Sequence, residues 1–175
     1  MRTLGFSWIF FLVGLLAVAA AVPAAKPPVT KVYIVRHAEK DLTPGLADPL
    51  LTPAGEARAR ALHQQLRRAK PAALFTTDTK RTRATLAPLA EATKLTPQVY
   101  DPRQQATLAE QIRRDYAGKT VVVVGHSNTL LPLVAALGAQ APLSEIKDEE
   151  YSYLFEVRIE GNGTPTVKMT QYGAR

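Results

Sequence analysis

The segment KVYIVRHAEK (Lys31–Lys40) holds the strongest structural signal in this chain. Its first residues are mostly β-branched or aromatic, which predicts a buried strand, and the polarity changes abruptly at Arg36 and His37. In open α/β sheets, ligands bind in the crevice beyond the carboxyl ends of the strands. A cation beside a titratable nucleophile at such a position therefore predicts a site for an anion, and phosphate is the obvious candidate.

A second segment, KTVVVVGHSNTLLPLVAAL (Lys119–Leu137), repeats this order of strand, histidine and helix. A run of four valines is too apolar for a half-exposed strand and is typical of the middle of a parallel sheet. His126 follows this strand, so we expect it at the same edge of the sheet as His37. Ser127 or Asn128 is expected to cap the following helix, whose first amides would also favour a bound anion.

Between these segments, ALFTTDTKRTRATLAPLAEATK (Ala72–Lys94) predicts another strand, a turn and a helix. Arg81 falls in the first turn of that helix. The helix dipole opposes a cation there, so an anionic partner would help to explain this arginine. Arg83 lies two residues further on, points elsewhere on the helix and is expected to have no such role.

The chain alternates between strand and helix patterns, which predicts a three-layer α/β/α sandwich with a mostly parallel central sheet. Residues 151–173 indicate two strands around Gly161–Gly163, which we expect to pair antiparallel at the sheet edge. The length fits one domain, residues 26–175. The other expected strands are residues 31–36, 72–76, a short one near Val99 and 120–125, and the expected helices are residues 53–69, 80–93, 103–115 and 127–138.

These segments together resemble the histidine phosphatase superfamily, also called phosphoglycerate mutase-like. Its opening Arg-His followed by a small residue is matched by Arg36–Ala38, and its second histidine after an apolar strand by His126. Its mid-chain pattern Ser-x-x-x-x-Arg-x-x-x-Thr is similar to Thr76–Thr85, with the arginine at Arg81. LTPAGEARARAL (Leu51–Leu62) resembles its Leu-Thr-x-x-Gly helix start. Four such motifs in this order are a specific signal.

The resemblance implies a role for each matched residue. His37 would be the nucleophile, which attacks phosphorus and forms a phosphohistidine that water later hydrolyses. Arg36, Arg81 and His126 would hold the phosphoryl oxygens, and Ser127 would add a contact at the helix start. This scheme requires no metal and no cofactor.

The general acid departs from the family pattern. Acid phosphatase members carry an aspartate directly after the second histidine, where this chain has Ser127. Mutase-like members carry a glutamate after the mid-chain arginine, but VYDPRQQATLAEQI (Val99–Ile112) has glutamines about where that acid would stand. We expect Asp101 to be the acid, ahead of Glu39, which is also a candidate substrate contact. General acid catalysis contributes about 10²–10⁴-fold. A protein without a general acid would therefore favour substrates with a good leaving group.

The N-terminal residues indicate export. Arg2 precedes an uncharged run, Thr3–Ala25, that is rich in Phe, Leu, Val and Ala, which predicts a secretory signal peptide over residues 1–25. An uncleaved membrane anchor is the alternative, because the run is long enough to span a bilayer. Either reading exports the domain, and we expect it in the periplasm. The chain has no cysteine, so neither a disulfide nor a lipidated cysteine is available.

Charge and loop length bear on the partner. The formal net charge of +7 would attract the domain to a membrane surface with anionic lipids, although solubility explains the same charge equally well. No basic stretch with interleaved aromatic residues is present, which argues against nucleic acid. The short connections predict an open pocket that would accept a phosphorylated sugar, glycolipid or protein.

We therefore expect an exported, metal-independent phosphatase that hydrolyses phosphate monoesters or related phosphoryl groups. One alternative is a noncatalytic phosphate-binding envelope protein that has lost the acid. Another is a metal-dependent hydrolase using His37, His126 and a carboxylate, although Arg36 and Arg81 would repel a divalent cation. Phosphoglycerate mutase activity is a weaker alternative, because the Trp-Asn element that mutases carry after the first histidine is absent.

Overall fold

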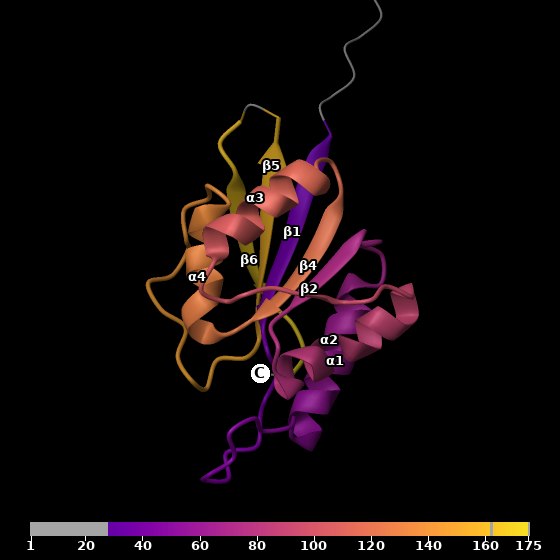
Figure 1. The fold of residues 1–175 in the computed structure, drawn as a ribbon, viewed down its shortest axis with the longest axis vertical. Coiled ribbons are helices and arrows are strands. Elements are labelled where there is room, and N and C mark those ends of the chain that lie inside the picture. The colour runs from indigo at the N-terminus through magenta and orange to yellow at the C-terminus, as the bar shows by residue number, and fades with distance from the viewer. Residues whose placement is uncertain (1–27, 162, 175) are drawn as a thin grey trace, which may run out of the picture.

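The computed structural model describes residues 28–161 and 163–174, which form a six-stranded sheet with helices on both faces (Figure 1). The predicted signal segment, residues 1–25, lies outside the described residues. The strands are β1 (Val29–Arg36), β2 (Ala73–Thr76), β3 (Gln98–Val99), β4 (Thr120–Gly125), β5 (Tyr153–Glu160) and β6 (Thr166–Gln171), and the helices are α1 (Pro53–Leu66), α2 (Lys80–Thr93), α3 (Gln105–Asp115) and α4 (Ser127–Ala136).

The sheet has the strand order β3-β2-β4-β1-β5-β6. The first four strands in this order run parallel to one another, because each returns through a helix. β5 pairs antiparallel with β1, and β6 pairs antiparallel with β5. The predicted sandwich, with its parallel centre and antiparallel C-terminal edge, is therefore confirmed.

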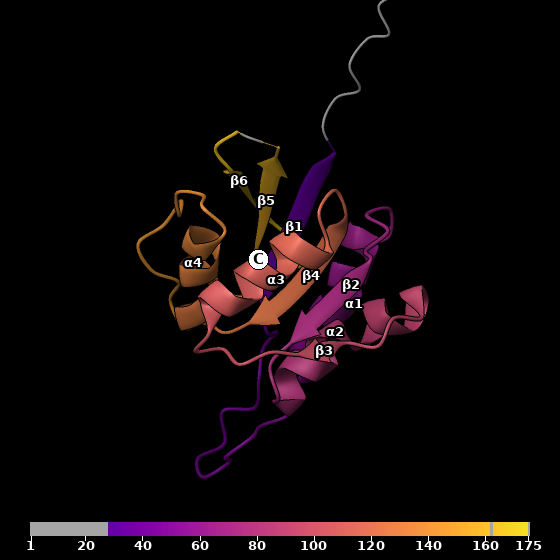
Figure 2. The same ribbon diagram turned by 45° about the horizontal axis from the view of Figure 1, so that its top comes forward.

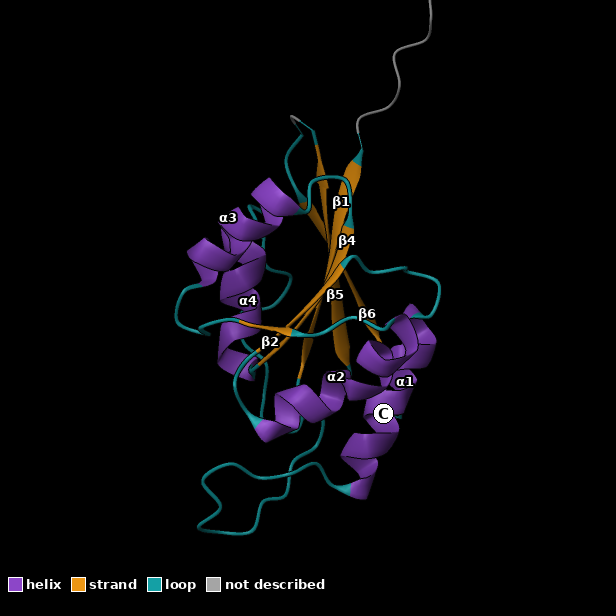
Figure 3. Cartoon of the chain, turned by 45° about the vertical axis from the view of Figure 1, so that its right-hand side comes forward, coloured by secondary structure: helices purple, strands orange, loops and turns teal. Residues whose placement is uncertain are grey.

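The run of valines in β4 lies at the centre of two apolar cores. Helices α1 and α2 cover one face of the sheet, and α3 and α4 cover the other (Figure 3). Val121 and Val123 pack in the core that includes residues of α3 and α4, whereas Val122 and Val124 pack in the core that includes residues of α1 and α2. All four valines are fully buried, which is why the run shows no alternation.

Helix α4 begins differently from the prediction. His126 is the N-cap residue, in an extended conformation with φ −123° and ψ 157°, and its backbone N–H donates to the hydroxyl of Thr129 at 3.0 Å. The expectation that Ser127 or Asn128 caps the helix is wrong, because the helix already begins at Ser127. Only His126 separates strand β4 from helix α4, so both elements position its backbone.

The direction of β1 places the two predicted histidines at one end of the molecule. β1 begins at Val29 at one end of the sheet and finishes at Arg36 at the other, where Arg36 lies opposite Gly125 of β4. The loop that follows β1 extends beyond the helices at this end (Figure 2). Within the described ranges, no helix has the length and apolar character needed to cross a bilayer.

Candidate active site

His37 and His126 lie side by side, as their positions after neighbouring parallel strands predict. Their ring centroids are 5.4 Å apart, and the backbone N–H of His37 donates to the carbonyl of Gly125 at 2.9 Å. His37 is 3% exposed, so the strand ends hold it below the surface. Two imidazoles from sequence positions far apart therefore face one another at the carboxyl edge of the sheet.

The hydrogen bonds of His37 determine which of its nitrogens is reactive. Burial, together with the positive charge of Arg36, lowers its pKa to about 3, so the ring is neutral near pH 7. Nδ1 lies 2.8 Å from the carbonyl oxygen of Ala38. Because that carbonyl can only accept, Nδ1 carries the single proton and Nε2 carries the free lone pair. His37 is thus held as a neutral nucleophile.

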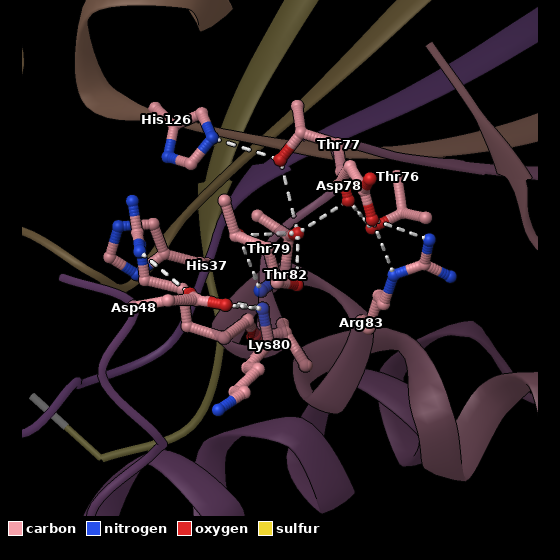
Figure 4. Close-up of polar contacts among 12 residues, drawn as sticks. His37, Asp48, Thr76, Thr77, Asp78, Thr79, Lys80, Thr82, Arg83 and His126 are labelled. Atoms are coloured by element: carbon pink, nitrogen blue, oxygen red, sulfur yellow. Dashed lines mark hydrogen bonds and ion pairs between the residues drawn. The ribbon is translucent and has the colours of Figure 1, made fainter.

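His126 is held in place by a network of threonine hydroxyls (Figure 4). Its Nε2 lies 2.9 Å from Oγ1 of Thr77, which is 3.1 Å from Oγ1 of the buried Thr82. The Thr82 hydroxyl donates to backbone carbonyls of the turn before α2. Burial lowers the pKa of His126 to about 4, and the charges of Arg81 and Arg36 add to the effect. The network orients a second neutral imidazole toward the site.

Arg36 is buried beside the two histidines. Its Nη1 donates to the carbonyl oxygens of Lys147 and Asp148, at 2.9 and 3.0 Å, and its guanidinium lies 4.2 Å from the ring centre of Tyr151. Its Nε is also buried and has no hydrogen-bond partner among the described residues. A buried N–H without a partner costs about 1–3 kcal/mol, which a ligand oxygen would recover.

Arg81 approaches the same place from the first turn of α2. Its Nη1 donates to Oδ1 of Asp48 at 3.3 Å, and its Nε, like that of Arg36, is buried without a partner in the described part of the chain. Asp48 also accepts from the backbone N–H of Lys80 at the start of α2. Two guanidiniums with an unused donor each are suited to an anion rich in acceptor oxygens.

A cleft of about 400 Å³ opens beside these residues. It contains the predicted side chains Arg36, His37, Arg81, His126 and Ser127, and its remaining walls are Lys40, Pro102, Arg103, Asn128, Thr129 and Asp148. Cations outnumber carboxylates in this lining, so the cleft favours an anion. No group of three or more His, Cys, Asp or Glu residues in the described ranges is placed to hold a metal ion.

The structure does not bring the two expected acids into the cleft. Asp101 forms an ion pair with Arg103, with Oδ2 2.9 Å from Nη2, and this partner lowers its pKa to about 2. Burial alone would raise the pKa of Glu39, but its hydrogen bonds from Arg58, at 2.7 to 3.0 Å, lower it. Both carboxyl groups are therefore ionised near pH 7, and neither lines the cleft.

Two residues of the site were missed or undervalued in the sequence. Asp148 lines the cleft, with its Oδ1 3.4 Å from Nη2 of Arg36, yet its side chain is 93% exposed. Tyr151 alternates with Tyr153 in a manner that predicted packing, but its ring lies 6.1 Å from that of His37. Both residues come from the loop before β5, which carries no recognisable motif.

Comparison with known families supports the reading of the first strand, His37 and Arg81. Residues 32–104 match the family model described as Histidine phosphatase superfamily (branch 1). This segment includes Arg36, His37 and Arg81, whereas His126 lies beyond it. A search of curated proteins found no match.

Solved structures share the fold at low sequence identity. A mycobacterial glucosyl-3-phosphoglycerate phosphatase has a TM-score of 0.65 and 16% identity, with 84% of this chain and 100% of that chain covered. The protein histidine phosphatase SixA, complexed with tungstate, has a TM-score of 0.65 and 18% identity, with 81% and 96% covered. A putative phosphohistidine phosphatase SixA from Nakamurella multipartitia has a TM-score of 0.59 and 22% identity, with 85% and 99% covered.

Proposed function

We propose that the chain is a phosphatase of the histidine phosphatase superfamily, whose family model matches residues 32–104, and that His37 is its nucleophile. The observation that carries this proposal is the state of the His37 ring. Its Nδ1 is bound to the Ala38 carbonyl, the ring is neutral near pH 7, and Nε2 is left free in a cleft with two guanidiniums whose Nε atoms are buried without a partner among the described residues. A neutral imidazole held in this way is a competent nucleophile for phosphorus.

In the proposed reaction, Nε2 of His37 forms a bond to phosphorus as the bond between phosphorus and the leaving group breaks. The proton on Nδ1 stays in place, and its hydrogen bond to Ala38 stabilises the positive charge that develops on the ring. Arg36 and Arg81 stabilise the transferring phosphoryl group electrostatically, and His126 orients it. Water then attacks the phosphohistidine, releases phosphate and restores the neutral ring.

The cleft offers little help to a poor leaving group. Asp148 is the carboxylate among its lining residues, and its side chain is 93% exposed and paired with Arg36. Without a general acid, the reaction loses a factor of about 10²–10⁴ for substrates whose leaving group must be protonated. We therefore infer a preference for phosphoryl groups on good leaving groups, such as phosphoanhydrides and N-phosphoryl groups.

The proposal also includes metal independence and export. Guanidiniums at Arg36 and Arg81 supply the positive charge that a metal would otherwise provide and would repel a divalent cation. The uncharged run Thr3–Ala25 supports export to the periplasm. Cell fractionation and the intact mass of the purified protein test export and cleavage, and a cytoplasmic protein of full-length mass would contradict both.

Phosphorylated compounds are the substrates named for the structural relatives, namely glucosyl-3-phosphoglycerate and phosphohistidine in proteins. We propose that the substrate of this chain is likewise phosphorylated. The first test is hydrolysis of p-nitrophenyl phosphate in the presence of chelator, because this aryl phosphate has a good leaving group.

Three proteins make this test decisive: the parent, His37→Ala and the matched control His63→Ala. His63 lies on helix α1 and does not line the cleft. We expect the parent and the control to hydrolyse the substrate with chelator present, and His37→Ala to lose activity. Quenching the parent in alkaline denaturant should trap a phosphoenzyme that is stable to base and is lost when the sample is acidified. A parent that binds phosphate without turnover would identify a noncatalytic binding protein instead.

A further inference from the structure

A second cavity adjoins the cleft on the side of the loop after β1. Its volume is about 310 Å³, and it shares Arg36, Lys40 and Asp148 with the cleft. Its other lining residues are Leu42, Glu149 and Tyr151. A substrate with its phosphorus at His37 can therefore extend past Lys40 and reach an apolar wall made by Leu42 and Tyr151.

The loop that carries Leu42 displays three leucines to solvent. Leu42, Leu46 and Leu50 are 74%, 49% and 62% exposed. The two sides of the loop are joined, because the backbone N–H of Asp41 donates to the carbonyl of Leu50 at 2.9 Å. The loop projects beyond the helices at the end of the sheet that holds the cleft (Figures 1 and 2). These three exposed leucines of one protruding loop are here called the leucine rim, and Leu42 among them also lines the second cavity.

The two aspartates of this loop accept hydrogen bonds from within the protein. Oδ1 of Asp41 accepts from the backbone N–H and the hydroxyl of Thr43, at 2.8 and 2.7 Å. Asp48 accepts from Lys80 and Arg81 at the start of α2. Single exposed leucines are ordinary, but Leu42 is 74% exposed and lines a cavity that adjoins the cleft, which indicates an apolar ligand there.

The cations are arranged for more than one phosphate. Arg36 and Arg81 flank His37, while Lys40 lies where the cleft and the second cavity meet, and Arg103 borders the cleft as well. A single phosphoryl group bound between the two guanidiniums leaves Lys40 for a second anion. The proposed lack of a general acid favours a phosphate as the leaving group, because it departs as an anion without protonation.

We propose that the substrate is a lipid diphosphate, an inference that rests on the proposed function. Nε2 of His37 bonds to the terminal phosphorus, and the bridging P–O bond breaks. The leaving group is the lipid monophosphate, held by Lys40, and its apolar tail lies along Tyr151 and the leucine rim. Water then converts the phosphohistidine to inorganic phosphate. The overall reaction is hydrolysis of one phosphoanhydride bond.

The test compares two diphosphates that differ in tail length, farnesyl diphosphate and isopentenyl diphosphate, with the full chain. Burial of the longer tail should raise kcat/KM for farnesyl diphosphate by at least about tenfold. The variant Leu42→Ser/Leu46→Ser/Leu50→Ser should lower the farnesyl-to-isopentenyl ratio by about tenfold, because it removes the apolar rim. Met169→Ser is the matched control, since Met169 is 38% exposed on edge strand β6, and it should leave the ratio unchanged.

Each alternative outcome has a distinct meaning. Equal kcat/KM for the two diphosphates, in parent and variant alike, would overturn the lipid assignment while hydrolysis of p-nitrophenyl phosphate keeps the proposed function intact. Inactivity on p-nitrophenyl phosphate would overturn the proposed function itself. If the triple variant loses activity only on a histidine-phosphorylated protein, the leucine rim docks a protein and the lipid assignment is wrong. Equal melting temperatures of parent and variant establish that the fold is retained.

Discussion

Replacing His37 with glutamine tests whether burial keeps the His37 ring neutral, because a buried neutral histidine makes the stability of the fold depend on pH. Burial lowers the pKa of His37 to about 3, whereas its ordinary value is 6.5. Between these values, the unfolded chain binds a proton that the folded chain does not. The free energy of unfolding is therefore highest above about pH 6.5 and decreases as the pH falls toward 3.

The size of the effect follows from the distance between the assay pH and the ordinary pKa. At about pH 5, some 1.5 units lower, the expected loss is about 2 kcal/mol at about 1.4 kcal/mol per unit. Urea unfolding followed by circular dichroism, at about pH 7.5 and about pH 5, measures it. On acidification, the free energy of unfolding should fall by about 2 kcal/mol more in the parent than in His37→Gln. His126 is present in both proteins, so its contribution cancels in this difference.

The variant His63→Gln is the control for this experiment. His63 is partly exposed on helix α1, and its replacement should leave the difference between the two pH values equal to that of the parent. If the parent and His37→Gln lose the same free energy on acidification, His37 is not held neutral by burial. The argument that makes Nε2 a nucleophile at neutral pH would then fail.

Three further substitutions test the supports of the site. Thr77→Val removes the hydroxyl that holds His126 and should lower kcat for p-nitrophenyl phosphate roughly fivefold with little change in KM, and Thr77→Ser should restore it. Arg58→Met leaves the Glu39 carboxylate without its partner and should lower the free energy of unfolding in urea by about 2 kcal/mol. Gly125→Ala places a Cβ 2.7 Å from the nearest hydroxyl oxygen. Thermal unfolding should therefore show that the free energy of unfolding falls by about 1–3 kcal/mol.

Matched controls separate these effects from general damage. Thr107→Val changes an exposed threonine on α3 and should leave kcat unchanged. Arg60→Met breaks an exposed ion pair with Glu56 and should change the free energy of unfolding by less than about 0.5 kcal/mol. If Arg60→Met loses as much free energy of unfolding as Arg58→Met, the role assigned to Arg58 is contradicted. If Thr77→Val keeps the kcat of the parent, the role assigned to the Thr77 hydroxyl is contradicted.

The sheet and the two histidines were predictable because their signals are local. The valine run of β4 is apolar on both faces, and only a strand between two layers of helices accepts such a run. His37 and His126 each follow such a strand, and parallel pairing brings strand ends together without further information. The position of Arg81 in the first turn of α2 is set by the cap at Thr79, which also lies within the motif.

The general acid and the apolar wall were not predictable, because tertiary contacts decide them. Asp101 is held by Arg103, two residues later, in an ion pair that competes with any catalytic role. Asp148 and Tyr151 reach the site only because Arg36, more than a hundred residues earlier, binds the backbone of their loop. The spacing of residues along the sequence does not predict that contact.

The direction of β1 determines at which end of the domain a retained N-terminal membrane anchor would be attached. Val29 starts the domain at the end of the sheet opposite the cleft, and the eight residues of β1 span about 26 Å at about 3.3 Å per residue. A retained N-terminal anchor would therefore turn the leucine rim away from its own bilayer. Cleavage of the predicted signal segment would instead leave the domain free to turn the leucine rim toward a membrane.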